Sequence, residues 1–487
     1  MKKSIIRIIC FMLILGIALL YVNHILKFKY YDGIYDMTKF YELEDDTVDV
    51  LVLGSSHAFE NFNTGVLWDD YGIVSYVLSG ASQPMWNTYY YLKEALKTQT
   101  PELIVLEGYC LYQYQEFMDD SVIIKNTYGM KWSEDKLNAI KISSPKERWN
   151  EFILGYTRYH ARYPELSKED FYKNQGNAVF NDWKGFECNM VTTALESMDV
   201  TEIDGRSPLY WKAEEYYRKT IELAQENNIP IVVVIAPYAG INGDEESLFN
   251  TASDIASEYG VNFINCNLLL NEIGIDYTTD TADAGHLNYK GNQKFTHYVG
   301  ALLKDNFAIS DRRGEIDYVS WQRNADYISQ QIYNQELLES YDFENVTKKI
   351  WNENYWLIIS VDGDCTTNDE ALQDFYSGMG IMNDERNGIW YRDNTYGINW
   401  YAHDGDEEKY VRTSAHDFCM RRYADKEGNY HNQVIIDNVK YKNIPNGINI
   451  VVYDTITESI VDDFGFDYYN GYSLVRYRKK LSDDFKN

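Results

Sequence analysis

Short apolar runs alternate with longer amphipathic stretches through the first two thirds of the chain. The runs have the length and β-branched content of buried strands; they are Val48–Leu53, Ile73–Leu78, Glu102–Leu106, Ile229–Ile235 and Val261–Asn265. The stretches with helical spacing are Pro84–Thr98, Leu209–Asn227, Ser247–Tyr259 and Tyr289–Lys304. Strands that alternate with helices of this length predict βαβ crossovers, and therefore an α/β fold with a parallel sheet covered on both faces.

The segment from Tyr109 to Arg206 interrupts this alternation. It is rich in tryptophan, tyrosine and charged residues, and we predict a mostly helical insertion over the carboxyl edge of the sheet. Ligands of open α/β sheets bind outside the carboxyl ends of the strands, so an insertion there is expected to shape substrate access.

The pattern changes after Asn306. Residues Ile316 to Ser340 are polar and aromatic and predict a helical connector. From Ile350 onward the apolar runs are short and are separated by turn sequences; they are Tyr355–Val361, Ile389–Tyr391, Gly397–Tyr401, Gln433–Ile436 and Ile448–Tyr453. With one predicted helix at Asp369–Gly378, this pattern indicates a second domain that is mainly β and β-sandwich-like.

The N-terminus has the pattern of a membrane anchor. Lys2, Lys3 and Arg7 precede an uncharged run from Ile8 to Val22, close to the length that spans a bilayer. No Ala-x-Ala-like cleavage site follows, which favours a signal anchor over a cleavable signal peptide. The positive-inside rule then predicts a cytoplasmic N-terminus and an extracytoplasmic remainder.

The expected organisation therefore has five parts. They are an anchor (1–27), a polar, irregular stalk (28–47), an α/β domain (48–307, with the insertion at about 109–206), a connector (308–348) and a mainly β domain (349–487).

Charge and cysteine content limit which ligands, metals and cross-links we expect for this chain. The formal net charge of −30 argues against nucleic acid, whose binding needs clustered Lys and Arg. Six cysteines without a Cys-x-x-Cys motif argue against a zinc ribbon. An oxidising compartment would allow Cys365 and Cys419 to pair, although their spacing does not require it. We interpret His403-Asp404-Gly405-Asp406 as an acidic turn rather than a cation site.

Candidate chemistry lies at the ends of the predicted strands. Ser56 follows the first strand, Gly80 follows the second, and Asp283 and His286 precede the last helix. A serine hydroxyl becomes a good nucleophile when a histidine takes its proton, and a carboxylate fixes the tautomer of that histidine. The backbone N–H groups of Ser56 and Gly80 are candidate donors to an oxyanion. These residues predict a Ser-His-Asp triad that needs neither metal nor cofactor.

The segments Gly54-Ser55-Ser56-His57, Ser79-Gly80 and Asp283-Ala284-Gly285-His286-Leu287-Asn288 resemble those of the SGNH (GDSL-like) hydrolase family. The resemblance covers about Asp49 to Phe307 and implies a three-layer αβα, flavodoxin-like domain. It implies Ser56 rather than Ser55 as nucleophile, Asp283 as orienting acid and His286 as base.

This chain departs from the family pattern after the third strand. The family has an asparagine there as a third oxyanion donor, whereas this chain has Glu107-Gly108-Tyr109-Cys110. The oxyanion hole therefore has either two donors or another group as its third. For His57, directly after the predicted nucleophile, we expect a role at the helix start, with its side chain pointing away from Ser56.

The anchor and the Gly-Ser-Ser-His variant are most similar to membrane-anchored, acyltransferase-like members of the family. That likeness implies a cell-surface polysaccharide or teichoic-acid-like substrate and a membrane-embedded partner that donates the acyl group. An O-acyltransferase and an esterase both fit the residues. A non-catalytic glycan-binding or cell-envelope assembly protein on the same fold is the alternative, and the missing asparagine keeps it open.

Three stretches of the last third are similar to ILEI/FAM-three-like domains, some of which bind carbohydrate. They are Leu357–Asp362, Ala371–Ile381 and Gly447–Asp454. Aromatic side chains such as Trp390 and Trp400 are candidates to stack on sugar rings, with core packing as the commoner alternative.

Overall fold

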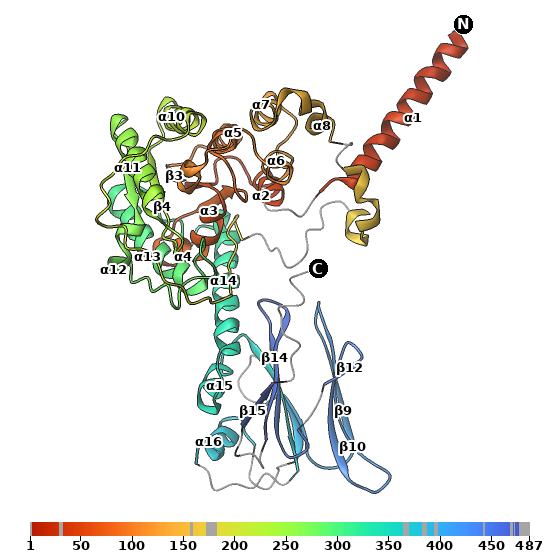
Figure 1. Cartoon of the computed structure of the whole chain (residues 1–487). Helices are drawn as coiled ribbons and strands as arrows, with labels where there is room; N and C mark the ends of the chain where they lie inside the picture. Colours follow the sequence, from red (N-terminus) through yellow and green to blue (C-terminus); the bar gives the residue numbers. More distant parts are fainter. Residues whose placement is uncertain are drawn as a thin grey trace. The chain divides into compact units, whose positions relative to one another are not determined.

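The computed structural model describes residues 2–28, 33–155, 159–171, 183–363, 370–381, 387–393, 398–441, 444–467, 471 and 473–476. The chain forms two compact units, Met1–Ile328 and Ser329–Asn487 (Figure 1).

The first unit is built on a five-stranded parallel sheet. Its strands are β1 (Val50–Gly54), β2 (Ser75–Ser79), β3 (Leu103–Glu107), β4 (Ile231–Ile235) and β5 (Asn262–Asn265), in the order β2-β1-β3-β4-β5. This is the strand order of flavodoxin-like folds, which place ligands at the carboxyl edge of the sheet. The predicted α/β class is confirmed.

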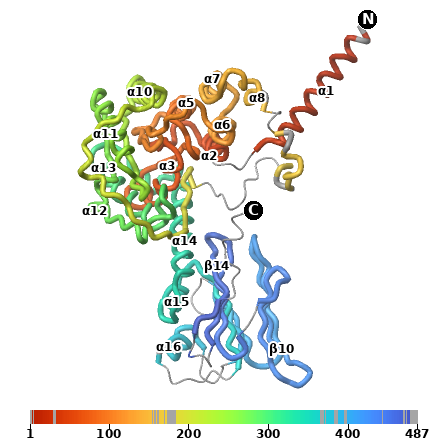
Figure 2. Tube along the Cα trace, in the orientation of Figure 1, coloured from red at the N-terminus to blue at the C-terminus, as the bar shows by residue number. Residues whose placement is uncertain are grey.

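Alternating strand residues pack against two different helical layers. Leu51 and Leu53 belong to a core formed with α5 (Met85–Ala95), α10 (Trp211–Glu226) and α11 (Gly243–Glu258). Val50 and Val52 belong to a second core, formed with α3 (Ser56–Asn61), α4 (Thr64–Tyr71) and α13 (Tyr289–Asn306). Figure 2 shows that α3 and α13 lie side by side although they are far apart in the sequence. The sheet is therefore the middle layer of three.

The predicted stalk is wrong in its structured part. Residues Ile34–Phe40 form helix α2, and the side chains of Met37 and Phe40 are fully buried in the same core as Tyr76. Because the neighbouring residues in the sequence are polar, this short apolar face was not recognised as a helix. Residues 29–32 lie outside the described part of the chain.

The predicted helical insertion is only partly helical. It contains η1 (Tyr109–Tyr112), α6 (Asp120–Thr127), α7 (Glu134–Ser143), η2 (Lys146–Arg148), α8 (Trp149–Leu154), η3 (His160–Glu165) and η4 (Lys168–Phe171). From Trp183 to Tyr210 the described chain has turns but neither helix nor strand. Its backbone is satisfied by other elements instead, since the Lys184 carbonyl accepts the Val77 N–H and the Phe59 carbonyl accepts the Glu187 N–H.

Helix α1 (Lys2–Leu26) contains the predicted anchor. Its segment Ile5–Leu26 has a mean hydropathy of 2.7 and is long and apolar enough to cross a membrane by length and composition. Its apolar side chains from Ile5 to Tyr21 are mostly exposed.

The second unit contains two antiparallel sheets. One has the order β15-β14-β13-β6-β7-β8, with strands β15 (Ser473–Arg476), β14 (Ser459–Asp467), β13 (Gly447–Asp454), β6 (Tyr355–Asp362), β7 (Gly388–Arg392) and β8 (Trp400–Ala402). The other has the order β12-β11-β10-β9, with β12 (Val439–Lys440), β11 (Tyr430–Ile436), β10 (Asp417–Ala424) and β9 (Glu407–Arg412).

The two sheets share a core in which Ile358, Ile389, Phe418 and Met420 pack together. The other face of the larger sheet packs against α15 (Phe343–Lys349), α16 (Glu370–Gly378) and the end of α14 (Val319–Leu338). The predicted β-sandwich-like class is confirmed, whereas the sequence-based prediction did not include β9, β10, β12, β14 and β15.

Trp390 is buried in this second core, with 1% of its surface exposed. Its proposed role in stacking on sugar rings is therefore wrong. Trp400 is half-buried against the core between the two sheets. Cys365, whose pairing with Cys419 was left open, lies outside the described residues.

Candidate active site

Ser56 begins α3 directly after β1 and a one-residue turn. Gly54 ends the strand, and a Cβ at that position would lie 2.8 Å from the Glu107 Cβ, so only glycine lets the two strands come this close. Ser55, which caps α3, is buried, whereas Ser56 is partly exposed. The tight turn therefore presents the second serine, rather than the first, to the carboxyl edge of the sheet.

The base and the acid reach Ser56 from the loop before α13. The His286 Nε2 lies 2.9 Å from the Ser56 Oγ, and the His286 Nδ1 lies 2.9 Å from the Asp283 Oδ1. Because an ionised carboxylate only accepts hydrogen bonds, Nδ1 carries the proton and Nε2 is free to accept the serine proton. The three side chains predicted from the sequence are thus within hydrogen-bond distance of one another.

Asp283 is held in its ionised form. Burial alone would raise its pKa, but the hydrogen bond from His286 and the N–H groups of Gly285 (2.8 Å) and His286 (3.1 Å) outweigh burial and hold the pKa of this carboxyl below its usual range. Asp283 therefore stays an acceptor for His286 at neutral pH.

Gly80 follows β2 at the same edge. Ser79 is paired with Gly54 in the parallel register, so the residues after these two strands are neighbours. A Cβ on Gly80 would lie 2.5 Å from the Asn126 Oδ1, and Asn126 also donates to the Ala81 carbonyl at 3.0 Å. Helix α6 thus fixes the turn that carries the second predicted oxyanion donor.

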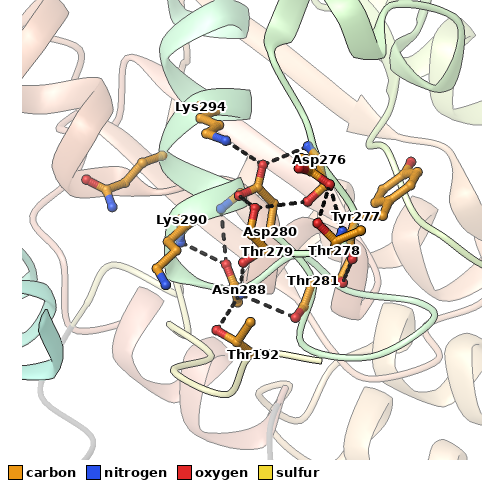
Figure 3. A network of polar contacts seen from close by, with 12 residues as sticks. Thr192, Asp276, Tyr277, Thr278, Thr279, Asp280, Thr281, Asn288, Lys290 and Lys294 are labelled. Carbon is orange, nitrogen blue, oxygen red and sulfur yellow. Dashed lines mark hydrogen bonds and ion pairs between the residues drawn. The ribbon is translucent and has the colours of Figure 1, made fainter. Parts of the chain in front are cut away.

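The loop that carries Asp283 and His286 is fixed by a polar network (Figure 3). Asn288 caps α13, because its Oδ1 accepts the N–H groups of Lys290 and Gly291, and its Nδ2 donates to the Thr279 carbonyl and the Thr192 Oγ1. Asp280, 1% exposed, pairs with Lys294 at 2.6 Å and accepts the Asp276 N–H. Both sides of the loop are therefore bound to α13.

An extended segment of the insertion crosses the same loop. The Thr193 N–H donates to the Thr281 carbonyl at 2.8 Å, the Thr193 Oγ1 donates to the Ala282 carbonyl, and the Thr281 Oγ1 donates back to the Thr193 carbonyl. Leu195 adds a bond to the Tyr277 carbonyl. We call residues 188–195 the strap; it binds both the triad loop and the start of α13, where the Tyr289 N–H donates to the Asn189 carbonyl at 2.8 Å.

A third connection joins the nucleophile helix to the histidine loop. The Asn61 Oδ1 on α3 accepts the Leu287 N–H at 3.1 Å, and the Thr296 hydroxyl on α13 donates to the Asn61 carbonyl. Asn61 therefore sets the distance between the element that carries Ser56 and the residue after His286.

His57 lies beside the triad, contrary to the expectation that it points away. It is 1% exposed, its ring stacks on Tyr109 with centroids 3.4 Å apart, and its centroid is 5.1 Å from those of Tyr238 and His286. Its Nδ1 is buried and has no hydrogen-bond partner within the described part of the chain. Burial, and secondarily the nearby His286, hold the pKa of His57 well below its usual value, so the ring is neutral.

Glu107 ends β3 beneath the nucleophile turn. It is fully buried, and burial raises its pKa to about 8, even though the Tyr109 N–H donates to its Oε1 at 3.1 Å. A carboxyl group with that pKa is mostly protonated at neutral pH, so it places no full charge below Ser56.

The sequence-based prediction gave His57 the wrong orientation, quoted Asn288 in a motif without a role, and did not include Asn61 or the strap. Each of them acts through a contact between segments that are distant in the chain, or through burial. Among the described residues no group of three or more His, Cys, Asp and Glu side chains is arranged to hold a metal ion.

No family model and no curated protein matches this chain. Several solved structures, among them the following three, align with it at low similarity. A Bacteroides fragilis protein assigned as an acylhydrolase is 9% identical, with 55% of this chain and 93% of that chain covered and a TM-score of 0.28. An acetyl xylan esterase is 14% identical, with 53% and 98% covered and a TM-score of 0.26.

The third structure is a gut microbial diltiazem-metabolizing enzyme, 12% identical, with 54% of this chain and 47% of that chain covered and a TM-score of 0.21. Similarity at this level does not place the chain in a family.

Proposed function

We propose that this protein is a membrane-anchored, exported serine acyl-transfer enzyme, an O-acyltransferase or esterase, that acts on cell-surface polysaccharide. The observation that carries the proposal is the hydrogen-bonded chain from Asp283 through His286 to Ser56, with both distances at 2.9 Å. A serine placed in this way after a strand, with its base oriented by a carboxylate, is arranged for nucleophilic attack on an acyl carbonyl.

The chemistry follows from the positions of the protons. The Ser56 Oγ attacks the carbonyl carbon of an ester while the His286 Nε2 takes the hydroxyl proton, and the carbonyl oxygen becomes an oxyanion. The N–H groups of Ser56 and Gly80 stabilise that charge. When the oxyanion collapses, His286 returns the proton to the leaving alcohol, and the acyl group remains on Ser56. Attack by a second hydroxyl then releases it by the same proton transfers in reverse.

The identity of that second hydroxyl separates the two activities. Water gives an esterase, and a sugar hydroxyl gives an O-acyltransferase. The apolar helix α1, with Lys2, Lys3 and Arg7 at its start, supports an anchor with a cytoplasmic N-terminus. In that topology the site faces the cell surface, where glycan hydroxyls are abundant, and a membrane-embedded partner would supply the acyl group.

The second unit supports a glycan substrate independently. On one face of its four-stranded sheet, Arg421 donates to the Gln433 Oε1 at 2.7 Å and lies over the Tyr423 ring, while Tyr410 is 69% exposed. A cavity of about 470 Å³ opens there and is lined in part by Tyr410, Arg412 and Cys419. The exposed Tyr410 ring and the polar side chains on the same face are groups that contact the apolar face and the hydroxyls of a sugar. We propose that this face binds the polymer.

The test separates transfer from hydrolysis. The full chain in detergent is incubated with an aryl acetate, with and without purified surface glycan, and both free acetate and glycan-bound acetate are measured. We expect acetyl groups on the glycan at a rate that Ser56→Ala abolishes. Release of acetate at an unchanged rate in the presence of glycan, without labelling of the glycan, identifies an esterase. Neither product with the wild-type chain contradicts the enzyme proposal and supports a non-catalytic glycan-binding protein.

A further inference from the structure

The position after β3, where a third oxyanion donor would be expected, is occupied by an aromatic pair. Helix η1 (Tyr109–Tyr112) begins two residues after Glu107, and the Tyr109 ring lies flat on His57 at 3.4 Å with an interplanar angle of 12°. Tyr238, which follows β4, meets the same imidazole edge to face and donates its hydroxyl to Glu245. No side chain of η1 is an amide, so this segment supplies no asparagine or glutamine donor.

His57, which lies on α3, brings its imidazole to the position expected for the third oxyanion donor. It is the second residue of α3, so its backbone is adjacent to that of Ser56. Because β3 lies next to β1 in the sheet, contact with Tyr109 after β3 puts the imidazole on the β3 side of Ser56, while Gly80 lies on the β2 side. The ring is thus opposite Gly80 across the nucleophile.

The imidazole has unused hydrogen-bonding capacity. Its Nδ1 is buried without a partner in the part of the chain that the structure describes. A buried N–H group without an acceptor costs about 1–3 kcal/mol, which disfavours a proton on Nδ1. Because Nδ1 has no acceptor nearby, the neutral ring carries its proton on Nε2. That atom lies 3.5 Å from the place where a Cβ of Gly285 would be, and therefore faces the loop between Asp283 and His286.

We propose that His57 is a catalytic residue, whose Nε2–H completes the oxyanion hole as its third hydrogen-bond donor. This inference rests on the proposed acyl-transfer function. Stacking between Tyr109 and Tyr238 fixes the ring, and burial keeps it neutral, so that it donates a hydrogen bond without competing with His286 for a proton. The donor acts when negative charge develops on the substrate oxygen, and it contributes little to binding of the uncharged ester.

The test compares two substitutions at this position. His57→Phe keeps an aromatic ring on Tyr109 but removes the N–H, and His57→Asn restores a donor of a different shape. For an activated aryl ester we expect His57→Phe to lower kcat about 100-fold or more with KM nearly unchanged, as loss of one oxyanion donor does. His57→Asn should recover at least about tenfold of that loss. A boronate that mimics the tetrahedral intermediate should bind His57→Phe more weakly, while the product alcohol should bind equally.

Thermal unfolding of each variant identifies a packing effect. If the wild-type chain acylates Ser56 and His57→Phe has the same kcat, the donor role is overturned. It is also overturned if both variants lose kcat equally, or if KM rises and the melting temperature falls together, since that result identifies packing. If the wild-type chain itself is never acylated, the proposed function fails, and the oxyanion role fails with it. Retained boronate affinity in His57→Phe contradicts the inference while leaving the triad intact.

Discussion

At the scale of single residues, the chemistry of the candidate active site depends on which side chains are ionised. Asp283 is ionised because three donors converge on it, whereas Glu107 is protonated near neutral pH because burial outweighs its two backbone donors, the N–H groups of Tyr109 and Ala236. His57 is neutral for the same reason as Glu107. The ionised Asp283 carboxylate is therefore the group that orients His286.

His286→Ala should lower turnover of an aryl ester about 10³-fold or more, and Asp283→Asn nearly as much, because the members of a triad act as a unit. His297→Ala is the matched control: that histidine lies on α13, is exposed and pairs with Asp70 at 2.9 Å, away from Ser56. Steady-state kinetics of the three variants measures the effect. Activity near the wild-type level in His286→Ala would exclude it as the base.

Glu107 predicts a pH dependence of stability. Its pKa is about 8 in the folded chain and near 4.5 when unfolded, so between these values the folded state binds more protons and the free energy of unfolding falls as pH rises. The slope reaches about 1.4 kcal/mol per pH unit, for a loss of up to about 5 kcal/mol.

Glu107→Gln should flatten this dependence, whereas Glu116→Gln, at an exposed carboxylate of the same unit, should leave it unchanged. Urea unfolding from pH 5 to 8 measures both. Parallel curves for Glu107→Gln and the wild-type chain would show that Glu107 is ionised in the folded protein.

The sequence identified Ser56, Asp283 and His286 because each lies at a position that a local pattern defines, namely a strand end or the start of a helix. His57 was misplaced because the orientation of its ring is set by Tyr109 and Tyr238, which are distant in the chain. Local pattern places a residue on an element, but packing from other elements decides which way a side chain points.

At the scale of elements, the site depends on how the loop before α13 is held. The strap, Asn61 and Asn288 each hydrogen-bond that loop. Apolar periodicity predicted the strands and helices of the sheet layers well, because the sheet buries complete apolar runs. It failed for α2 and for the strap, since a short helix and an extended segment satisfied by other elements have no period to detect.

Asn288→Ala should lower kcat about tenfold or more, because the loop loses its helix cap and the bond to the Thr279 carbonyl, and a misplacement of His286 weakens proton transfer. Asn306→Ala is the matched control at the other end of the same helix, where the side chain bonds only its own helix at 2.8 Å. Kinetics and thermal unfolding are measured on both. If Asn288→Ala loses stability but keeps the wild-type kcat, Asn288 supports the fold and does not position the base.

At the scale of the whole molecule, the chain combines an apolar helix, an α/β unit with the candidate site and a β unit with an aromatic and polar face. Five strands of the second unit were missed, and β9 and β10 show one cause. β9 has the sequence Glu-Glu-Lys-Tyr-Val-Arg, and β10 alternates buried residues with partly exposed polar ones, so neither shows a continuous apolar run. In a sheet with one face towards solvent, only every second residue of a strand is apolar, so the sequence shows no continuous apolar run.

Tyr410→Ala should lower acyl transfer to the polymer severalfold through KM, while hydrolysis of a small aryl ester stays unchanged, because this face binds the acceptor and takes no part in bond formation. Tyr341→Ala removes an equally exposed tyrosine of the same unit outside the four-stranded sheet and is the matched control. Assays of the full chain with each substrate measure acyl transfer to the polymer and hydrolysis of the aryl ester separately. An equal loss on both substrates would assign Tyr410 a structural role.

Acylation of Ser56 is the step on which the whole account rests, and mass spectrometry of the acid-quenched full chain after treatment with an activated acyl ester measures it directly. We expect one acyl group per chain, located on Ser56 by fragmentation of the peptide that contains both serines, absent from Ser56→Ala and strongly reduced in His286→Ala. An acyl group on Ser55, or an unmodified wild-type chain, would contradict the account.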